Sequence, residues 1–78
     1  MSNRTIYHVV YDSSDEKWKV KLQGATRASA AFDTKQEAID RARELAKNNE
    51  PSQVIVHKKD GTFETEWTYG DDPERHPG

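Results

Sequence analysis

The strongest constraint on the fold is that the sequence holds one helical pattern, and that the apolar face of this pattern is narrow. Five apolar residues recur at steps of three and four positions: Ala38, Ile39, Ala42, Leu45 and Ala46. Charged residues fill most of the remaining positions. A helix with one narrow stripe needs an apolar surface to cover it, and short alanine side chains let that surface come close. The rest of the chain is therefore expected to supply a sheet.

Both ends of this helix carry recognisable signals. Thr34 and Glu37 fit a capping box, in which each side chain accepts a hydrogen bond from the backbone N–H of the other residue. At the far end, Asn48 and Asn49 tolerate the left-handed cap conformation, and Pro51 cannot continue a helix. The pattern predicts a helix that begins just after Thr34 and ends before Pro51.

Two strands are predicted before the helix, with a third left open. Residues 6–11 are β-branched and aromatic, and the turn formers of 12–16 follow them. Next, Trp18, Val20 and Leu22 alternate with lysines, which is the period of a strand with one apolar face. Residues 29–32 could form a short third strand, but their small side chains give a weak signal.

A hairpin is predicted after the helix, because Asp60-Gly61 separates two strand-like runs, 53–57 and 63–69. This dipeptide is typical of a two-residue type I′ turn, which would place Lys59 opposite Thr62. On the core side, this register pairs Val54 with Trp67 and Val56 with Thr65, with Phe63 beside Lys58. On the other side it pairs Ile55 with Glu66 and His57 with Glu64.

Together these elements predict an α+β fold. We expect a two-layer sandwich of order β-β-(β)-α-β-β, in which an antiparallel sheet of four to five strands carries one helix on one face. Residues 1–70 would form this single domain, and residues 71–78 a flexible acidic tail. The sheet face without a helix is the candidate interaction surface. It is expected to display Lys19, Lys21, Ile55, His57, Glu64 and Glu66.

Composition narrows the classes of protein further. The chain has 78 residues, of which 32% are hydrophobic and 33% charged, and its mean hydropathy is -1.12. A chain of this length is expected to form one small hydrophobic core, which excludes a multidomain enzyme. It has no cysteine, so disulfides and thiolate metal sites are excluded. No signal peptide or membrane span is evident, and we expect a cytoplasmic protein.

The residues that could carry chemistry show no motif for it. His8, His57 and His76 lack metal-ligand spacing, and a contact of His57 with Glu64 would be an ordinary cross-strand pair. There is no glycine-rich phosphate loop, and no serine sits in a motif that would activate its hydroxyl. We therefore expect a protein that is not an enzyme, with no catalytic residue, no cofactor, no metal and no evident small-molecule substrate.

Binding is the remaining class of function. We expect the open sheet face to bind a second copy of the chain or another protein. The alternative is nucleic acid, because Lys17, Lys19 and Lys21 stand near the aromatic Trp18. An isoelectric point of 5.9 and the acids expected on the same sheet weigh against this alternative.

Short stretches along most of the chain resemble a known bacterial family. They are His8-Val9-Val10, Trp18-Lys19-Val20-Lys21, Gly24-Ala25, Arg27-Ala28-Ser29, Phe32 with Thr34-Lys35, Glu37-Ala38-Ile39, Ala42-Arg43-Glu44-Leu45-Ala46, Val56-His57 with Asp60-Gly61, and Tyr69-Gly70 with Asp72-Pro73. Their order and spacing resemble the family called domain of unknown function 2188. The resemblance implies one small bacterial domain and carries over no functional residue. Tyr11 stands where that family usually has proline, which bears on the end of the first strand.

Overall fold

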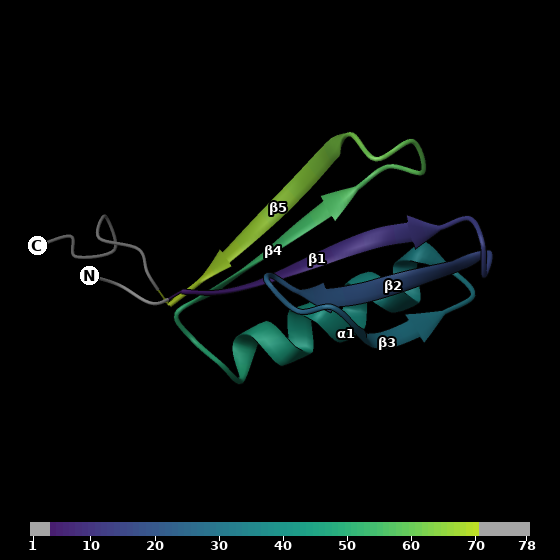
Figure 1. The fold of residues 1–78 in the computed structure, drawn as a ribbon. Helices are drawn as coiled ribbons and strands as arrows, with labels where there is room; N and C mark the ends of the chain where they lie inside the picture. The colour runs from purple at the N-terminus through teal and green to yellow at the C-terminus, as the bar shows by residue number, and fades with distance from the viewer. Residues whose placement is uncertain (1–3, 71–78) are drawn as a thin grey trace, which may run out of the picture.

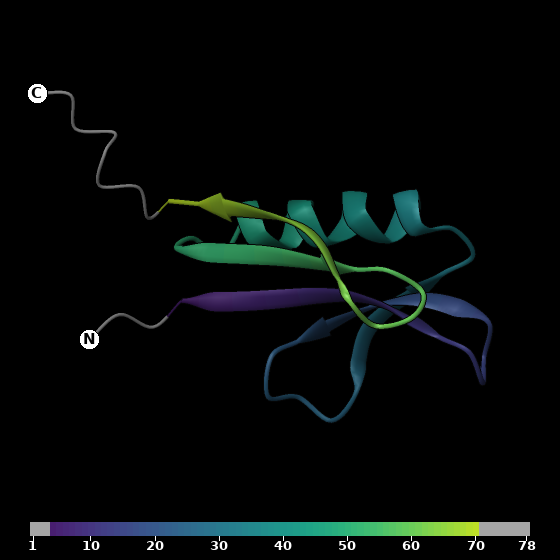
Figure 2. The same cartoon turned by 90° about the horizontal axis from the view of Figure 1, so that it is seen from above.

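The computed structural model describes residues 4–70, which form one mixed sheet with one helix lying across it (Figure 1). The elements are β1 (Thr5–Asp12), β2 (Lys17–Leu22), β3 (Ala28–Phe32), α1 (Lys35–Lys47), β4 (Ser52–His57) and β5 (Phe63–Tyr69). Seen from above, α1 runs along one side of the sheet (Figure 2). The expected α+β architecture with two layers is confirmed, and the run left open by the sequence is a strand, β3. The predicted tail, 71–78, lies outside the described residues.

The sheet is mixed and not purely antiparallel as predicted. Its strand order is β3-β2-β1-β4-β5, and the central pair β1 and β4 is parallel, while the other neighbours are antiparallel. The reason is the path of the chain. After β3, α1 carries the chain back along the sheet, so that β4 starts at the same end as β1 and runs beside it.

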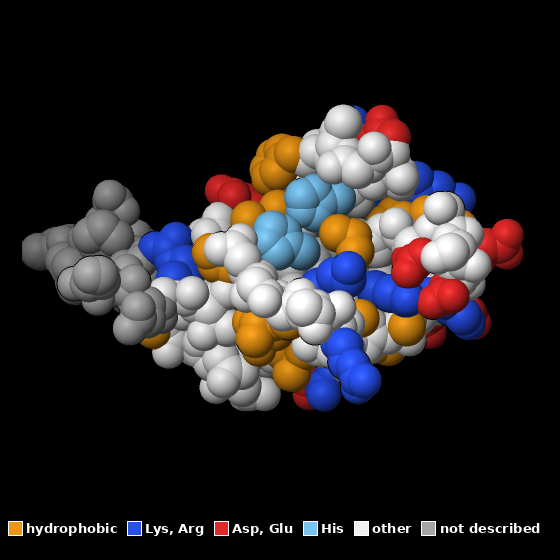
Figure 3. Space-filling model, viewed as in Figure 1, with side chains coloured by type: hydrophobic (Ala, Val, Ile, Leu, Met, Phe, Trp, Pro, Cys, Tyr) orange, Lys and Arg blue, Asp and Glu red, His pale blue; other side chains and the backbone are white. Residues whose placement is uncertain are grey.

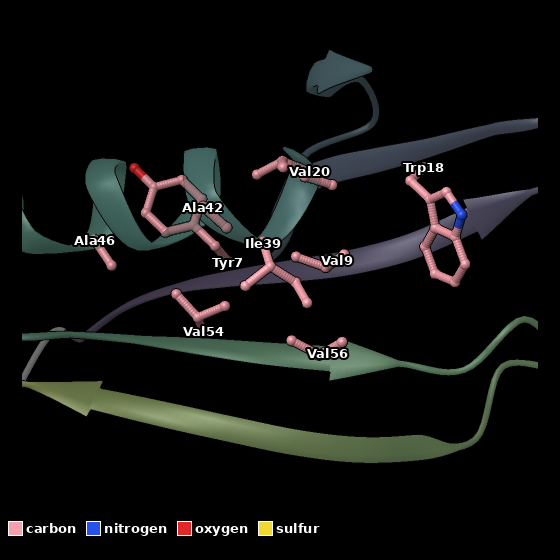
Figure 4. Packing of buried hydrophobic residues seen from close by; sticks show 10 residues of the cluster. Tyr7, Val9, Trp18, Val20, Ile39, Ala42, Ala46, Val54 and Val56 are labelled. Atoms are coloured by element: carbon pink, nitrogen blue, oxygen red, sulfur yellow. The ribbon is translucent and has the colours of Figure 1, made fainter. Parts of the chain in front are cut away.

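The core lies between α1 and the three central strands. Val9, Val20, Val54 and Val56 are completely buried there. Each fully buried valine contributes about 1.5 kcal/mol or more through the removal of apolar surface from water. Figure 4 shows these side chains gathered around Ile39, with Ala42 and Ala46 of α1 nearby. Ala38, Ala42 and Ala46 have no exposed surface, as their close approach to the sheet requires.

One polar side chain belongs to this core. Ser52, at the start of β4, is fully buried, and its hydroxyl donates a hydrogen bond of 2.5 Å to the carbonyl oxygen of Ala46. The same carbonyl also accepts a hydrogen bond of 3.1 Å from the Asn49 N–H, so the end of the helix is bonded both to the turn that follows it and to Ser52. The Ser52 bond ties the end of α1 to the strand that follows.

The hairpin between β4 and β5 has a different turn from the predicted one. Its loop has three residues, 59–61, because the Lys58 N–H donates to the Thr62 carbonyl at 2.8 Å. The Gly61 N–H donates to the Lys58 carbonyl at 2.9 Å, and Gly61 takes a φ of 94°. Asp60 accepts hydrogen bonds from the backbone and hydroxyl of Thr62. A type I′ turn needs a positive φ at both central residues, and Asp60 does not adopt one.

An irregularity in β5 changes the register near this turn. The pairs Val54–Trp67, Ile55–Glu66 and Val56–Thr65 are confirmed, but His57 lies opposite Phe63 and not opposite Glu64. Glu64 is the extra residue of a β-bulge. Its carboxylate accepts a hydrogen bond of 2.6 Å from the Lys35 ammonium, which places it on the helix side of the sheet.

Candidate interaction face

The candidate site is the sheet face opposite α1, called here the open face. Residues of four adjacent strands point to it, alternating with the core residues of those strands. They are Lys17, Lys19 and Lys21 from β2; Ile6, His8, Val10 and Asp12 from β1; Gln53, Ile55 and His57 from β4; and Phe63, Glu66 and Thr68 from β5. Figure 3 shows this face, with two histidine side chains side by side near its centre and hydrophobic groups around them. Phe63 is 57% exposed.

Four of these residues form one straight row across the open face. Lys21 pairs with His8, His8 with Ile55, and Ile55 with Glu66, so the row crosses β2, β1, β4 and β5 in turn. A cation therefore stands at one end of the row and an anion at the other. Within residues 4–70, neither of them has an ion-pair partner, although Gln53 Nε2 donates to the Glu66 carboxylate at 2.7 Å.

The structure places five of the six predicted surface residues on the open face: Lys19, Lys21, Ile55, His57 and Glu66. Glu64 is the correction, because the bulge in β5 turns it toward α1. The prediction assumed a regular hairpin, and one extra residue moves a side chain to the opposite face.

Lys19 was expected to present a free charge on the open face, but its ammonium is already paired within the chain. Its ammonium donates to Asp12 at 2.8 Å and to Asp15 at 2.5 Å. These two hydrogen bonds raise the pKa of Lys19. The bond from Lys19, followed by the bond from the Ser14 hydroxyl, holds the pKa of Asp12 far below its usual value. This cluster closes the β1–β2 hairpin and leaves Lys21 as the free cation of β2 among the described residues.

The centre of the open face is a histidine pair that the sequence analysis missed. His8 Nδ1 and His57 Nε2 lie 3.0 Å apart, and the two rings are stacked with centroids 5.2 Å apart and planes 25° from parallel. The residues are 49 positions apart in the chain and meet because β1 and β4 are neighbours. Alternation could have placed both on one face, but no sequence signal paired these two strands.

The predicted basic hairpin exposes fewer groups that could bind nucleic acid than its sequence suggests. Trp18 is only 7% exposed and packs on the core side, where its ring contacts Tyr11 at a centroid distance of 5.2 Å. The Lys35 ammonium lies 5.6 Å from the centroid of the Trp18 ring. Lys17 forms an ion pair with Asp33. The indole is therefore not placed to stack on a base, and two of the three lysines are already paired.

Away from the open face, the described residues form a hollow beside α1. A hollow of 340 Å³ lies on the outer side of α1, and polar residues line it: Asp40, Arg43, Glu44, Lys47 and Asn48. Between residues 4 and 70, no three His, Asp or Glu side chains gather to hold a metal ion. Over the same range, the helix is too short and too polar to cross a membrane.

The comparisons with known proteins agree with the resemblance seen in the sequence. The family model described as "Uncharacterized protein conserved in bacteria (DUF2188)" matches residues 7–69, from β1 to β5. The chain belongs to this family. A bacterial relative is the "Uncharacterized protein YdaT" of Bacillus subtilis, which is 49% identical over 47 residues. That alignment covers 60% of this chain and 31% of the relative, so the chain spans about a third of its length. No solved structure matches the chain.

The DUF2188 match includes both histidines and all four residues of the charged row. Tyr11, the departure from the family noted in the sequence, lies inside β1, which continues to Asp12. There it packs against the core and lies under the Lys59 ammonium, 4.8 Å from its ring centroid.

Proposed function

We propose that this DUF2188 domain is a non-catalytic interaction module that acts in the cytoplasm and self-associates through its open face. The observation that carries this proposal is the row Lys21–His8–Ile55–Glu66. Its two ends bear opposite charges without ion-pair partners among the described residues, and its middle is partly apolar.

The row is complementary to itself in one arrangement of two copies. Consider a two-fold axis that runs parallel to the strands, between β1 and β4, with the two open faces against each other. Rotation about this axis places β2 of one copy over β5 of the other, and β1 over β4. Lys21 then faces Glu66 of the second copy at both ends of the row, and His8 faces Ile55. An axis across the strands would instead bring Lys21 over Lys21.

Apolar surface adds to this charge complementarity. Ile6, Val10 and Ile55 are only half-buried in the single chain, and Phe63 is exposed. Two sheets that pack face to face lie about 10 Å apart with strands about 30° from parallel, which allows such side chains to interdigitate. A small domain gains proportionally more from a dimer than a large one, because its own core is limited.

A charge swap tests the proposed arrangement. Lys21→Glu and Glu66→Lys each bring like charges together at both ends of the row, so each is expected to shift the protein from dimer to monomer. The combined variant restores opposite charges and is expected to restore the dimer. The measurement is sedimentation equilibrium of each variant over a concentration series at low salt.

Arg41→Glu and Glu44→Lys are the matched controls, because they reverse the same charges on the exposed side of α1. Both are expected to leave the dimer unchanged. A combined variant that stays monomeric while it remains folded would refute this pairing of the two faces. A wild-type protein that is monomeric at every concentration would refute self-association itself.

Nucleic acid has less support than a second copy. Trp18 is buried, and Lys17 and Lys19 are paired with carboxylates of the same chain. Short DNA and RNA duplexes added in the same experiment test this alternative. If it is correct, the mass increases with the duplex and falls again when salt is added.

A further inference from the structure

The hydrogen bonds around the histidine pair define which ring nitrogens carry protons. His57 Nδ1 lies 3.3 Å from the Gly61 carbonyl oxygen, and His8 Nε2 lies 2.9 Å from Gln23 Oε1. Both oxygens can only accept hydrogen bonds, so each of these nitrogens must be the donor. In a neutral imidazole the other nitrogen is then without a proton.

The two remaining nitrogens face each other. They are His8 Nδ1 and His57 Nε2, at 3.0 Å, and both carry lone pairs when the rings are neutral. Two lone pairs at this distance repel unless a cation lies between them, either a proton that one ring donates to the other or a metal ion. In a tetrahedral zinc site, with Zn–N bonds of about 2.0–2.1 Å, two imidazole nitrogens are about 3.3 Å apart. A small opening of the pair would therefore reach metal-binding geometry.

The outer hydrogen bonds also match those of a metal site. Histidines that bind metal ions almost always donate their other ring N–H to a carboxylate, a carbonyl or water, which fixes the ring and its tautomer. Gln23 and the Gly61 carbonyl take this place for His8 and His57. Both rings are thus held with their free nitrogens turned toward each other.

The proposed dimer brings a second pair to the first. His8 lies on β1 and His57 on β4, two residues further along, so their contact crosses the line between these strands diagonally. The two-fold axis proposed above runs along this same line. Rotation about it places the second pair over the first in a crossed arrangement, and four imidazole nitrogens then converge on the axis.

We propose that two copies of the chain bind one divalent transition-metal ion of the zinc class through His8 Nδ1 and His57 Nε2 of each copy. This inference rests on the proposed dimer, since residues 4–70 of one copy supply only two ligands. Four neutral imidazoles arranged tetrahedrally match the geometry that zinc takes in proteins.

The charged neighbours of the pair are compatible with a cation only in the dimer. Lys21 pairs with His8 in the sheet, and its ammonium would oppose a metal ion in the single chain. In the proposed dimer, it faces Glu66 of the second copy. Lys19, further along β2, is already paired with Asp12 and Asp15. Within the described part of the chain, Asp12 and Glu66 are the carboxylates of the face, and neither is bonded to a histidine ring.

The test uses the full chain without a histidine tag. Zinc is titrated by calorimetry, and sedimentation equilibrium is run with zinc and with a chelator. We expect one ion per two chains and a dimer that zinc strengthens at least tenfold. Cobalt(II) added in place of zinc should show the intense visible absorption of a tetrahedral site. His8→Gln and His57→Gln should each abolish these effects, and His76→Gln is the matched control, with unchanged binding.

Gln23→Leu provides a second variant that removes no ligand. Loss of an outer hydrogen bond typically lowers metal affinity about 10- to 100-fold, so weaker binding at unchanged stoichiometry is expected. Binding of one ion per chain without a change in mass would overturn the shared site. A dimer that passes the charge-swap test but ignores zinc would overturn this inference alone. A monomer with and without zinc would overturn the proposed function as well.

Discussion

At the scale of single residues, the described part of the chain uses short polar side chains to close its connections. Asp12 accepts hydrogen bonds from the backbone and hydroxyl of Ser14 and from Lys19 across the hairpin. Asp60 plays the same role with Thr62 in the next hairpin, and its pKa is lowered by those bonds. Such carboxylates are more stable ionised in the folded chain than in the unfolded one.

This difference predicts how stability changes with pH. The pKa of Asp12 is lowered in the folded protein, first by the bond from Lys19 and then by that from Ser14. Its contribution is therefore complete above the unfolded value of about 3.9 and is lost as the pH falls below it. Urea unfolding between pH 2 and pH 7 should show the acid-side loss in the wild type. Asp12→Asn should lower the stability at pH 7 and flatten that loss, whereas parallel curves would contradict this role.

At the scale of elements, α1 shows how local signals and packing combine. The capping box is confirmed: the Glu37 N–H donates to Thr34 Oγ1 at 3.2 Å, and the Thr34 N–H donates to the Glu37 carboxylate at 3.3 Å. The helix ends at Lys47, with Asn48 as its cap. Because its buried face is mostly alanine, α1 depends on this cap more than a helix with large apolar anchors would.

Removal of the cap should therefore be measurable. Thr34→Ala leaves the Glu37 N–H without its side-chain acceptor and should lower the free energy of unfolding by about 1 kcal/mol. Thr34→Ser keeps the hydroxyl and should cost much less. Urea unfolding of the three proteins at pH 7 makes the comparison, and equal losses in both variants would show that the hydroxyl is not the cause.

At the scale of the whole molecule, a five-stranded sheet is covered on one face only. The covered face holds the completely buried valines, while the open face combines half-buried apolar residues with a row of charge and a histidine pair. The family match reaches all five strands and omits only Thr5 and Ile6 at the start of β1. On the uncovered face, the residues of the charged row are aligned across four neighbouring strands.

If the open face forms a dimer, thermal stability must depend on concentration. Above the dissociation constant, each tenfold increase in protein should add about 1.4 kcal/mol, by mass action on the folded dimer. This free energy is shared by the two chains of the dimer, about 0.7 kcal/mol each, so for a domain of this size it corresponds to about 3–5 °C in Tm. Differential scanning calorimetry over a hundredfold range makes the measurement. Lys21→Glu should remove the dependence, and a Tm of the wild type that does not change with concentration would contradict the dimer.

The sequence by itself determined most of the elements, because they depend on local physics. Alternation in 18–22 fixed the core side of β2, and the box of Thr34 and Glu37 fixed the start of α1. The short strand β3 was left open, and the predicted pairs of β4 with β5 are correct because the bulge at Glu64 offsets a loop one residue longer than predicted. Five of the six predicted surface residues also followed, since side chains of a strand alternate between its two faces.

Only the tertiary structure decided the rest, because it depends on which distant segments become neighbours. The parallel pairing of β1 with β4 joins His8 to His57, and no local pattern encodes that choice. The bulge that turns Glu64 toward Lys35 belongs to the folded hairpin and is not encoded by the Asp60-Gly61 signal. The charged row depends on the same choice of neighbours. Alternation within each strand predicts which face each residue lies on, but only the pairing of the strands aligns the four residues in one row.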